Sequence, residues 1–229
     1  MVPERFKLLN KILKKRQPDL RVVMDEVHKL HNFSAIVRTC DAIGASDVHY
    51  IPAETGLKVS SGLAQGSQKW VNVNKHKDLH EAISELKEQN FTVVAANFSD
   101  NAINCRDYDF TQPTAILMGT ELQGVSDKAI SLCDHEIFVP MVGMVESLNV
   151  SVACAVILYE AQRQREAAGM YNECRITPDN YKHILFEWSY PKIARHCQQN
   201  KLPYPELNEV GDIIGEVPGS AGIPLKGKK

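Results

Sequence analysis

Three short segments of the chain carry residues whose types and spacing suit chemistry on a ligand. The first, residues 31–39, reads HNFSAIVRT and places Asn32 six positions before Arg38 at the start of an expected helix. An asparagine amide can cap a helix, and arginine brings a permanent positive charge with five donors. Taken alone, this segment favours a helix cap at Asn32 and a solvated Arg38, because charged residues on helix surfaces are mostly exposed and structural.

The second segment, residues 119–124, reads GTELQG and directly follows the apolar run TAILM. Two glycines permit a tight turn and a close approach of the backbone to a ligand. The carboxylate of Glu121 could accept hydrogen bonds from a sugar or an amine. An ordinary turn between a strand and a helix explains the same letters equally well.

The third segment, residues 137–153, reads IFVPMVGMVESLNVSVA. An apolar strand runs into Pro140, an apolar loop containing Gly143 follows, and Ser147 and Asn149 open the next helix. Connecting loops are normally polar and exposed, so an apolar loop needs a cover. Either the apolar face of a cofactor or a partner subunit would provide one, and we favour such a function over a buried structural loop.

The elements that must position these segments alternate between strand and helix. Strands are expected at residues 20–27, 47–51, 71–74, 91–97, 114–118 and 136–139, and helices at 3–17, 32–43, 78–89, 126–132 and 147–168. Asp78 is expected to cap one helix and Gly44 to end another. The alternation predicts an α/β fold with a mainly parallel sheet covered by helices on both faces. Ligands of such sheets bind at the carboxyl ends of the strands.

The chain divides into three predicted regions. Residues 1–18 form a basic N-terminal helix, residues 19–168 the catalytic domain, and residues 169–229 a helical extension with a flexible tail. Helical pieces are expected at 180–186 and 191–200. The stretch 209–229 is rich in proline and glycine, which predicts poor order.

Composition excludes several classes of protein. The 229 residues carry a net charge of −2, and the six cysteines contain no C-x-x-C pair, which indicates free thiols in a reducing cytoplasm. We expect no secretory signal and no bilayer-spanning segment. The first strand is followed by no G-x-G-x-x-G, and no Walker A lysine is present. His28 and His31 have no ligand partners at a suitable spacing, so no metal is expected.

Basic residues cluster near the N-terminus. Seven lysines and arginines lie between residues 4 and 21 against two acidic residues, Glu4 and Asp19. Such a cluster is typical of a surface that binds phosphates. Lys11, Lys14, Lys15 and Arg16 are the candidates for RNA contact. The alternative is a solvated helix face, and the two readings are compatible.

Together, the three segments resemble the SpoU/TrmH branch of the SPOUT methyltransferases. The resemblance covers residues 20–165 and rests on N-x-x-A-x-x-R at 32–38, G-x-E-x-x-G at 119–124 and P-M-x-G-x-x-x-S-L-N-V-S-V-A at 140–153. The basic first helix, YEAQRQR from 159 and LPYP at 202–205 are similar to the bacterial TrmH group. That group methylates the ribose 2′-hydroxyl of guanosine 18 in the D-loop of tRNA.

The resemblance implies a fold, a cofactor and an assembly. The C-terminal part of the sheet would be threaded into a trefoil knot, a rare exception to unknotted topology. S-adenosyl-L-methionine would be the methyl donor. Its binding residues would be Ala96, Asn97, Gly119, Val139, Met141, Gly143 and Leu148. The protein would be a homodimer with the helices after Asn32 and Ser147 at the interface. Related proteins often have threonine where this chain has Ala96, so a hydroxyl contact there would be absent.

The resemblance also implies catalytic roles for Arg38, Asn32, Glu121, Ser147 and Asn149. The family assigns activation of the 2′-hydroxyl to Arg38. An arginine keeps its proton up to a pH of about 12, so stabilisation of the developing charge is the version we prefer over proton removal. Three alternatives stay open: a methyltransferase acting on ribosomal RNA, a catalytically silent RNA-binding protein, and an α/β enzyme unrelated to RNA.

Overall fold

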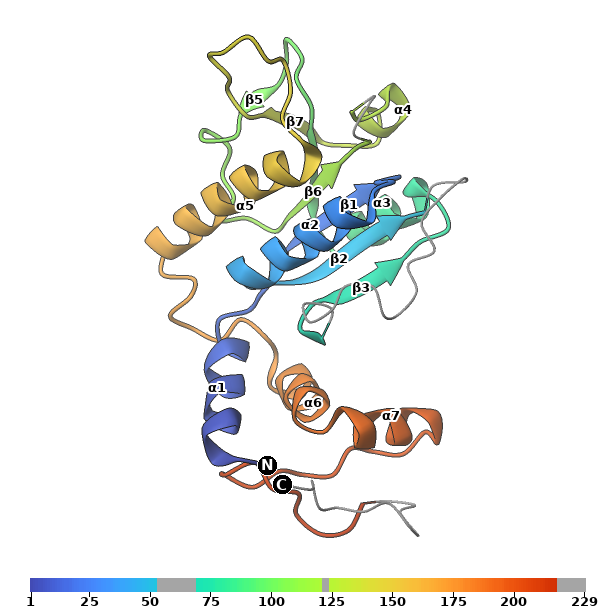
Figure 1. Cartoon of the computed structure of the whole chain (residues 1–229), viewed down its shortest axis with the longest axis vertical. Helices are drawn as coiled ribbons and strands as arrows, with labels where there is room; N and C mark the ends of the chain where they lie inside the picture. Colours follow the sequence, from blue (N-terminus) through green and yellow to red (C-terminus); the bar gives the residue numbers. More distant parts are fainter. Residues whose placement is uncertain (53–68, 121–123, 218–229) are drawn as a thin grey trace. The chain divides into compact units, whose positions relative to one another are not determined.

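The chain forms two compact units. The computed structural model describes residues 1–52, 69–120 and 124–217. The larger unit is Gln17–Asn172, and the smaller unit combines Met1–Arg16 with Glu173–Lys229 (Figure 1). Within the described residues, none of the helices has the length and apolar character needed to cross a bilayer.

A seven-stranded sheet forms the centre of the larger unit. Its strands are β1 (Gln17–Asp25), β2 (Ala45–Ile51), β3 (Asn72–Lys75), β4 (Thr92–Ala96), β5 (Ile103–Asn104), β6 (Thr114–Met118) and β7 (His135–Phe138). The order is β3-β2-β1-β6-β4-β7-β5, and every neighbouring pair is parallel. The predicted parallel α/β sheet is confirmed. The short β5 was not predicted, because two residues give no periodic signal.

Helices cover both faces of the sheet. On β1, Val22 and Met24 point into a core formed with α2 (Leu30–Ile43) and α5 (Val150–Ala167). Val23 points to the opposite face, where α3 (Leu79–Glu88) and α4 (Asp127–Ile130) pack. This alternation follows from the two-residue period of a strand. It explains the unbroken apolar runs of the central strands, which are buried on both faces.

The helix ends differ in part from those expected. Gly44 ends α2 with φ of +89°, and Asp78 caps α3 by accepting a hydrogen bond from the backbone N–H of Glu81, both as predicted. The predicted cap at Asn32 is wrong, because α2 begins two residues earlier with Lys29 at the N-cap. Asn32 therefore lies inside the first turn, where its side chain makes a tertiary contact instead of a cap.

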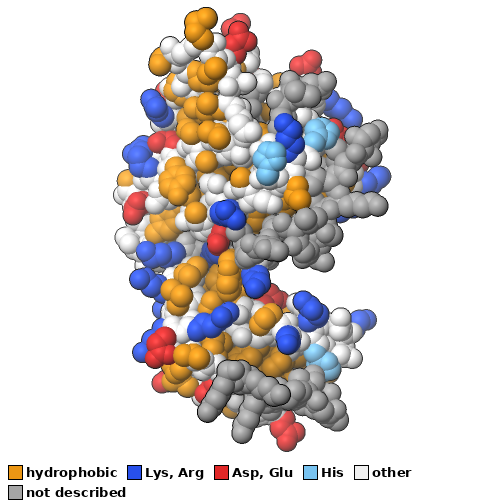
Figure 2. Space-filling view, viewed as in Figure 1, with side chains coloured by type: hydrophobic (Ala, Val, Ile, Leu, Met, Phe, Trp, Pro, Cys, Tyr) orange, Lys and Arg blue, Asp and Glu red, His pale blue; other side chains and the backbone are white. Residues whose placement is uncertain are grey.

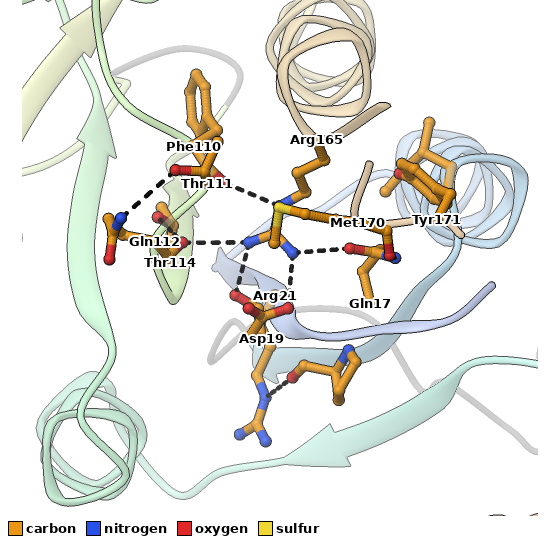
Figure 3. A network of polar contacts seen from close by, with 12 residues as sticks. Gln17, Asp19, Arg21, Phe110, Thr111, Gln112, Thr114, Arg165, Met170 and Tyr171 are labelled. Atoms are coloured by element: carbon orange, nitrogen blue, oxygen red, sulfur yellow. Dashed lines mark hydrogen bonds and ion pairs between the residues drawn. The ribbon is translucent and has the colours of Figure 1, made fainter. Parts of the chain in front are cut away.

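A buried arginine anchors the far end of α5. Arg165 is fully buried, and its Nη1 forms an ion pair with Asp19 Oδ1 at 2.6 Å (Figure 3). Nη1 also donates to Gln17 Oε1 at 3.1 Å, and Nε donates to the carbonyl of Phe110 at 2.8 Å. Nη2 donates to the carbonyls of Asp19 and Gln112, each at 3.1 Å. These bonds tie α5 to the start of β1 and to the segment that leads into β6.

The smaller unit contains α1 (Pro3–Leu13), α6 (Pro178–Ser189) and α7 (Pro191–Gln199). The phenol of Tyr181 on α6 donates to Asn10 Oδ1 on α1 at 2.8 Å. The core includes Phe186, Cys197 and Val217.

The C-terminal stretch 209–217, for which poor order was expected, is mostly exposed but contributes Val217 to the core of the smaller unit. Val217 is only 2% exposed. Gly211 lies so close to Phe6 that a Cβ atom there would be 2.5 Å from its ring. Residues 53–68 and 218–229 lie outside the described residues.

Candidate active site

A cavity of about 420 Å³ opens beyond the carboxyl ends of β4, β6 and β7. Its walls come from the segments that follow these strands and from the first turns of α5. Six of the residues expected to bind a cofactor line it: Ala96, Asn97, Gly119, Val139, Met141 and Leu148. Ser147 lines it as well. The seventh expected residue, Gly143, is exposed and is not part of the described wall.

Phe98, Phe138 and Glu146 also line the cavity and were not predicted. The side chain of Phe98 is 74% exposed, and its ring meets that of Phe138 edge to face at 5.4 Å between centroids. A large apolar residue in a short loop directly after a strand was the signal that could have drawn attention to Phe98. Glu146 gave no such signal, because a single acidic residue before a helix is commonplace.

The turn after β6 depends on its glycines. A Cβ atom on Gly119 would lie 2.1 Å from the carbonyl oxygen of Gly124, so only glycine fits. Thr120 and Gly124 exchange two backbone hydrogen bonds of 2.9 and 3.1 Å, and Gly124 has φ of +66°. The turn thus brings backbone groups to the cavity wall. Glu121, which was expected to act in catalysis, lies outside the described residues.

Asn32 and Asn149 meet where α2 and α5 begin. Asn32 is 1% exposed, and its Oδ1 accepts a hydrogen bond from Asn149 Nδ2 at 3.3 Å. Asn149 is also the N-cap of α5, since its Oδ1 accepts from the backbone N–H of Ser151 at 2.9 Å. One side chain therefore both starts α5 and links it to α2.

Arg38 lies farther along α2 than Asn32. Six residues of helix correspond to about 9 Å along its axis. Its side chain is exposed, and in the part of the chain that is described it does not line the cavity. The structure therefore brings Asn32 and Asn149 together and places Ser147 in the cavity wall. It leaves Arg38 on the outer surface of the same helix as Asn32.

The thiols near this region are poor nucleophiles. Burial raises the pKa of Cys154, on the inner side of α5, to about 12. Burial, with the nearby Asp134 carboxylate, raises the pKa of Cys133 to about 12. A thiol that stays protonated near neutral pH does not attack. Among residues 1–52, 69–120 and 124–217, no group of three His, Cys, Asp or Glu side chains could hold a metal ion.

The sequence matches known proteins over nearly its whole length. It is 46% identical to the tRNA (guanosine(18)-2′-O)-methyltransferase of Escherichia coli (strain K12) over 215 residues, covering 93% of this chain and 94% of the relative. It is 48% identical to the protein of that name from Thermus thermophilus, covering 80% of this chain and 95% of the relative.

Solved structures agree with this likeness. The A. aeolicus TrmH/SpoU tRNA modifying enzyme superposes with a TM-score of 0.75 at 46% identity, covering 82% of this chain and 96% of the other. The SpoU methyltransferase AviRb from Streptomyces viridochromogenes, in complex with the cofactor AdoMet, superposes with a TM-score of 0.59 at 30% identity. In that case 66% of this chain and 62% of the other are covered.

Family models match the same regions that the structure separates into sheet and helical extension. The model of the SpoU rRNA methylase family matches residues 19–159, and that of the SpoU rRNA methylase C-terminal region matches residues 163–216. Sheet, cavity and sequence thus agree, and the chain belongs to the SpoU rRNA methylase family.

Proposed function

We propose that this protein transfers a methyl group from S-adenosyl-L-methionine to the ribose 2′-hydroxyl of guanosine 18 in the D-loop of tRNA. The observation that carries the proposal is identity of 46% to an enzyme of that activity over 93% of the chain. The cavity at the strand ends, lined by the residues that the resemblance indicated, supports it. The names of the relatives at 44–48% identity, which specify tRNA, favour tRNA over ribosomal RNA as the substrate.

The cavity fits a cofactor of this kind. Its volume of about 420 Å³ lies in the usual range for small-molecule sites, roughly 300–1,000 Å³. Val139, Met141 and Leu148 offer apolar surface, while Asn97 and the Gly119 turn offer polar groups. The Asn97 amide is oriented by a hydrogen bond of 2.6 Å from its Nδ2 to Glu136 Oε2. We propose that Ala96, Asn97, Gly119, Val139, Met141 and Leu148 hold the cofactor, together with Gly143 of the exposed loop before α5.

When bound, S-adenosyl-L-methionine supplies a methyl group on a positively charged sulfur, and in-line displacement by the 2′-oxygen leaves a thioether and a released proton. The chain must then orient the ribose and stabilise negative charge that develops on the 2′-oxygen. We assign the second task to Arg38, because an arginine guanidinium brings a positive charge and five N–H donors but no acceptor. It would do this while binding the adjacent phosphate.

The remaining catalytic assignments concern position. We propose that Asn32 holds the start of α2, that Asn149 fixes the start of α5, and that Ser147 orients the ribose or the cofactor from the cavity wall. Glu121, which follows Gly119 and Thr120 in the sequence, would also orient the ribose or the cofactor. The C-terminal part of the sheet would be threaded as a trefoil knot, which brings these loops together.

A second copy of the chain is the proposed cover for the exposed apolar surface of α5. Val152, Val156 and Tyr159 are 47%, 40% and 54% exposed and recur at helical spacing along one side of α5. Val142, Met144 and Val145 of the loop before α5 are exposed as well. Hydrophobic side chains gather over this region of the larger unit (Figure 2). Such a surface is typical of a homodimer interface, and it would place the active site close to the second subunit.

Lysines of α1 are the proposed contacts to tRNA phosphates. Lys11 and Lys14 line a shallow cavity of about 720 Å³ in the smaller unit, and Lys15 is exposed beside them. Arg16, which was expected to contact RNA, is not among the proposed contacts. Its side chain is 1% exposed and lies over the ring of Trp188, 5.1 Å from the ring centroid. A buried guanidinium cannot reach a phosphate on the surface.

We propose that the protein acts in the cytoplasm, because its cysteines are free thiols.

The deciding experiment is methylation of an unmodified tRNA transcript with labelled S-adenosyl-L-methionine, followed by mapping of the modified nucleoside. We expect label on the ribose of guanosine 18, and none on a transcript that carries 2′-deoxyguanosine at that position. Label on a base, or incorporation only into ribosomal RNA, would contradict the proposal.

The homodimer is tested by light scattering after size-exclusion chromatography. Val156→Glu should convert a dimer into a monomer, because it introduces a charge into the covered surface. Val210→Glu is the matched control, since Val210 is 46% exposed in the smaller unit. A monomeric wild-type chain would rule out the dimer.

A further inference from the structure

At the start of α5, the side chain of Ser151 lies next to both Asn149 and Asn32. The hydroxyl of Ser151 lies 2.6 Å from Asn149 Oδ1 and 3.5 Å from Asn32 Oδ1. Ser151 is partly buried and occupies the first turn of α5, and it does not line the cavity within the described residues. It therefore contacts both proposed catalytic asparagines without forming part of the cavity wall.

The distances indicate which group donates and which accepts in each of these hydrogen bonds. A serine hydroxyl has one hydrogen to donate, and the nearer acceptor by far is Asn149 Oδ1. That oxygen then accepts two hydrogen bonds, one from the hydroxyl and one from the backbone N–H of Ser151 at 2.9 Å. With its oxygen held in this way, the amide of Asn149 can only turn its Nδ2 toward Asn32 Oδ1, 3.3 Å away.

The opposite orientation of the Asn149 amide is unfavourable. It would bring Nδ2 against the backbone N–H of Ser151 and leave two donors facing each other. It would also turn Asn149 Oδ1 toward Asn32 Oδ1, where two acceptors would meet. Because Asn32 is 1% exposed, its oxygen would lose the 3.3 Å hydrogen bond from Asn149 Nδ2 in a place that water does not readily reach. The Ser151 hydroxyl is a more distant donor, 3.5 Å away.

We propose that Ser151 is a positioning residue for methyl transfer, because its hydroxyl adds a second hydrogen bond to the one from the backbone N–H and so holds the Asn149 amide more firmly in its orientation. The consequence reaches both sides of the site. Asn149 directly follows Ser147 and Leu148, which line the cavity, and Asn32 lies on the helix that carries Arg38. A fixed Asn149 amide therefore aligns the cavity wall with α2. The catalytic consequence of this inference rests on the proposed function. The orientation of the Asn149 amide is independent of that function.

The test compares Ser151→Ala with Ser151→Thr in the full-length protein. The rate constant of a single turnover is measured at saturating tRNA and S-adenosyl-L-methionine, and the Kd of S-adenosylhomocysteine is measured by calorimetry. We expect the alanine variant to lose about threefold to tenfold in rate, the range that corresponds to one hydrogen bond. The Kd should change by less than about twofold, and threonine, which keeps the hydroxyl, should restore the rate.

Ser131→Ala is the matched control, because the Ser131 hydroxyl also donates at 2.8 Å, to the carbonyl of Lys128 at the end of α4. It should leave both quantities unchanged. An unchanged rate in Ser151→Ala would overturn the inference. Equal losses in the alanine and threonine variants, or a loss that appears entirely in the Kd, would overturn it as well.

Side-chain amide signals in a ¹⁵N NMR spectrum separate this inference from the proposed function, because they need no activity. The Nδ2 proton of Asn149 that faces Asn32 should keep the chemical shift of a hydrogen-bonded amide in the wild type and in Ser151→Thr, and should move toward the value of a free asparagine amide in Ser151→Ala. An unchanged chemical shift of this proton in the alanine variant would reject the orienting role. Inactive wild-type protein with the expected spectra would reject the activity and leave the orienting role intact.

Discussion

The two ends of α5 are held in place by different kinds of contact. At its C-terminal end, Arg165 is fully buried and all five of its N–H donors have an acceptor, including the Asp19 carboxylate. At its N-terminal end, three small neutral side chains share hydrogen bonds beside a cavity, and Asn149 itself is exposed. A buried charge with every donor satisfied holds one arrangement strongly. Neutral amides at the surface hold their arrangement weakly but leave room for a ligand.

This difference indicates a division of labour along one helix. Stability should depend mostly on the arginine end and catalysis mostly on the asparagine end. Substitutions at the two ends should therefore separate in two measurements, the free energy of unfolding and the rate of methyl transfer.

The largest expected effect is that of Arg165→Ala on stability. Removing one partner of a buried ion pair leaves the other charge and several carbonyls without partners, at a cost of about 3–5 kcal/mol. Chemical denaturation followed by circular dichroism measures it. Arg163→Ala is the control, since Arg163 is 65% exposed and pairs with Glu160 on the surface. Its loss should be roughly 0–1 kcal/mol. Similar values for the two variants would remove the contrast between the two ends.

Arg38→Ala should give the largest effect on catalysis. Loss of a group that stabilises developing charge lowers turnover by about 100-fold or more. The free energy of unfolding should change by less than about 0.5 kcal/mol, because the side chain is exposed. Turnover is read with labelled S-adenosyl-L-methionine, and cofactor binding by calorimetry. Turnover equal to that of the wild type would reject the assignment of Arg38.

Asn149→Ala should affect both quantities to an intermediate extent. The variant removes the N-cap of α5, which costs about 1 kcal/mol, and it releases Asn32. We expect a rate loss of about tenfold or more, because the start of α2 is no longer aligned with the cavity. Denaturation and single-turnover kinetics on the same preparation measure the two. A loss of stability without a loss of rate would show that this end, too, is only structural.

The smallest expected effects on stability and on the rate of methyl transfer are those of substitutions in the smaller unit. Neutralising Lys14 and Lys15 together should weaken tRNA binding and lower the slope of log affinity against log salt by about 2. Stability and the single-turnover rate at saturating tRNA should stay at wild-type values. Filter binding at several salt concentrations gives the slope. An unchanged slope would exclude these lysines from phosphate contact.

The sequence was sufficient for the parallel sheet, and the resemblance named seven of the 17 described residues that line the cavity. Unbroken apolar runs, helix caps such as Asp78 and the stop at Gly44 are local signals, so the residues alone reveal them. Six of the seven expected cofactor residues line one cavity, because they follow parallel strands whose carboxyl ends meet at the same edge. The assignments of Arg38, Ser147 and Glu121 stay predictions.

Other features depended on contacts between distant residues. Asn32 was expected to cap its own helix and instead bonds to Asn149, 117 residues away in sequence. Arg16 belongs to a run of basic residues, yet it is buried against Trp188. The stretch 209–217 has the composition of a loose tail, yet Val217 is part of a core.

The sequence by itself determined the periodic pattern, the turn glycines and the two segments, 119–124 and 137–153, that contribute to the cavity wall. Each of these is set by a residue and its immediate neighbours. Only the tertiary structure decided which side chains became buried and which amide faced which partner. The partner of Asn149, like that of Arg165, is supplied by another element of the fold. Neither the periodicity nor the charge of a segment specifies where that element packs.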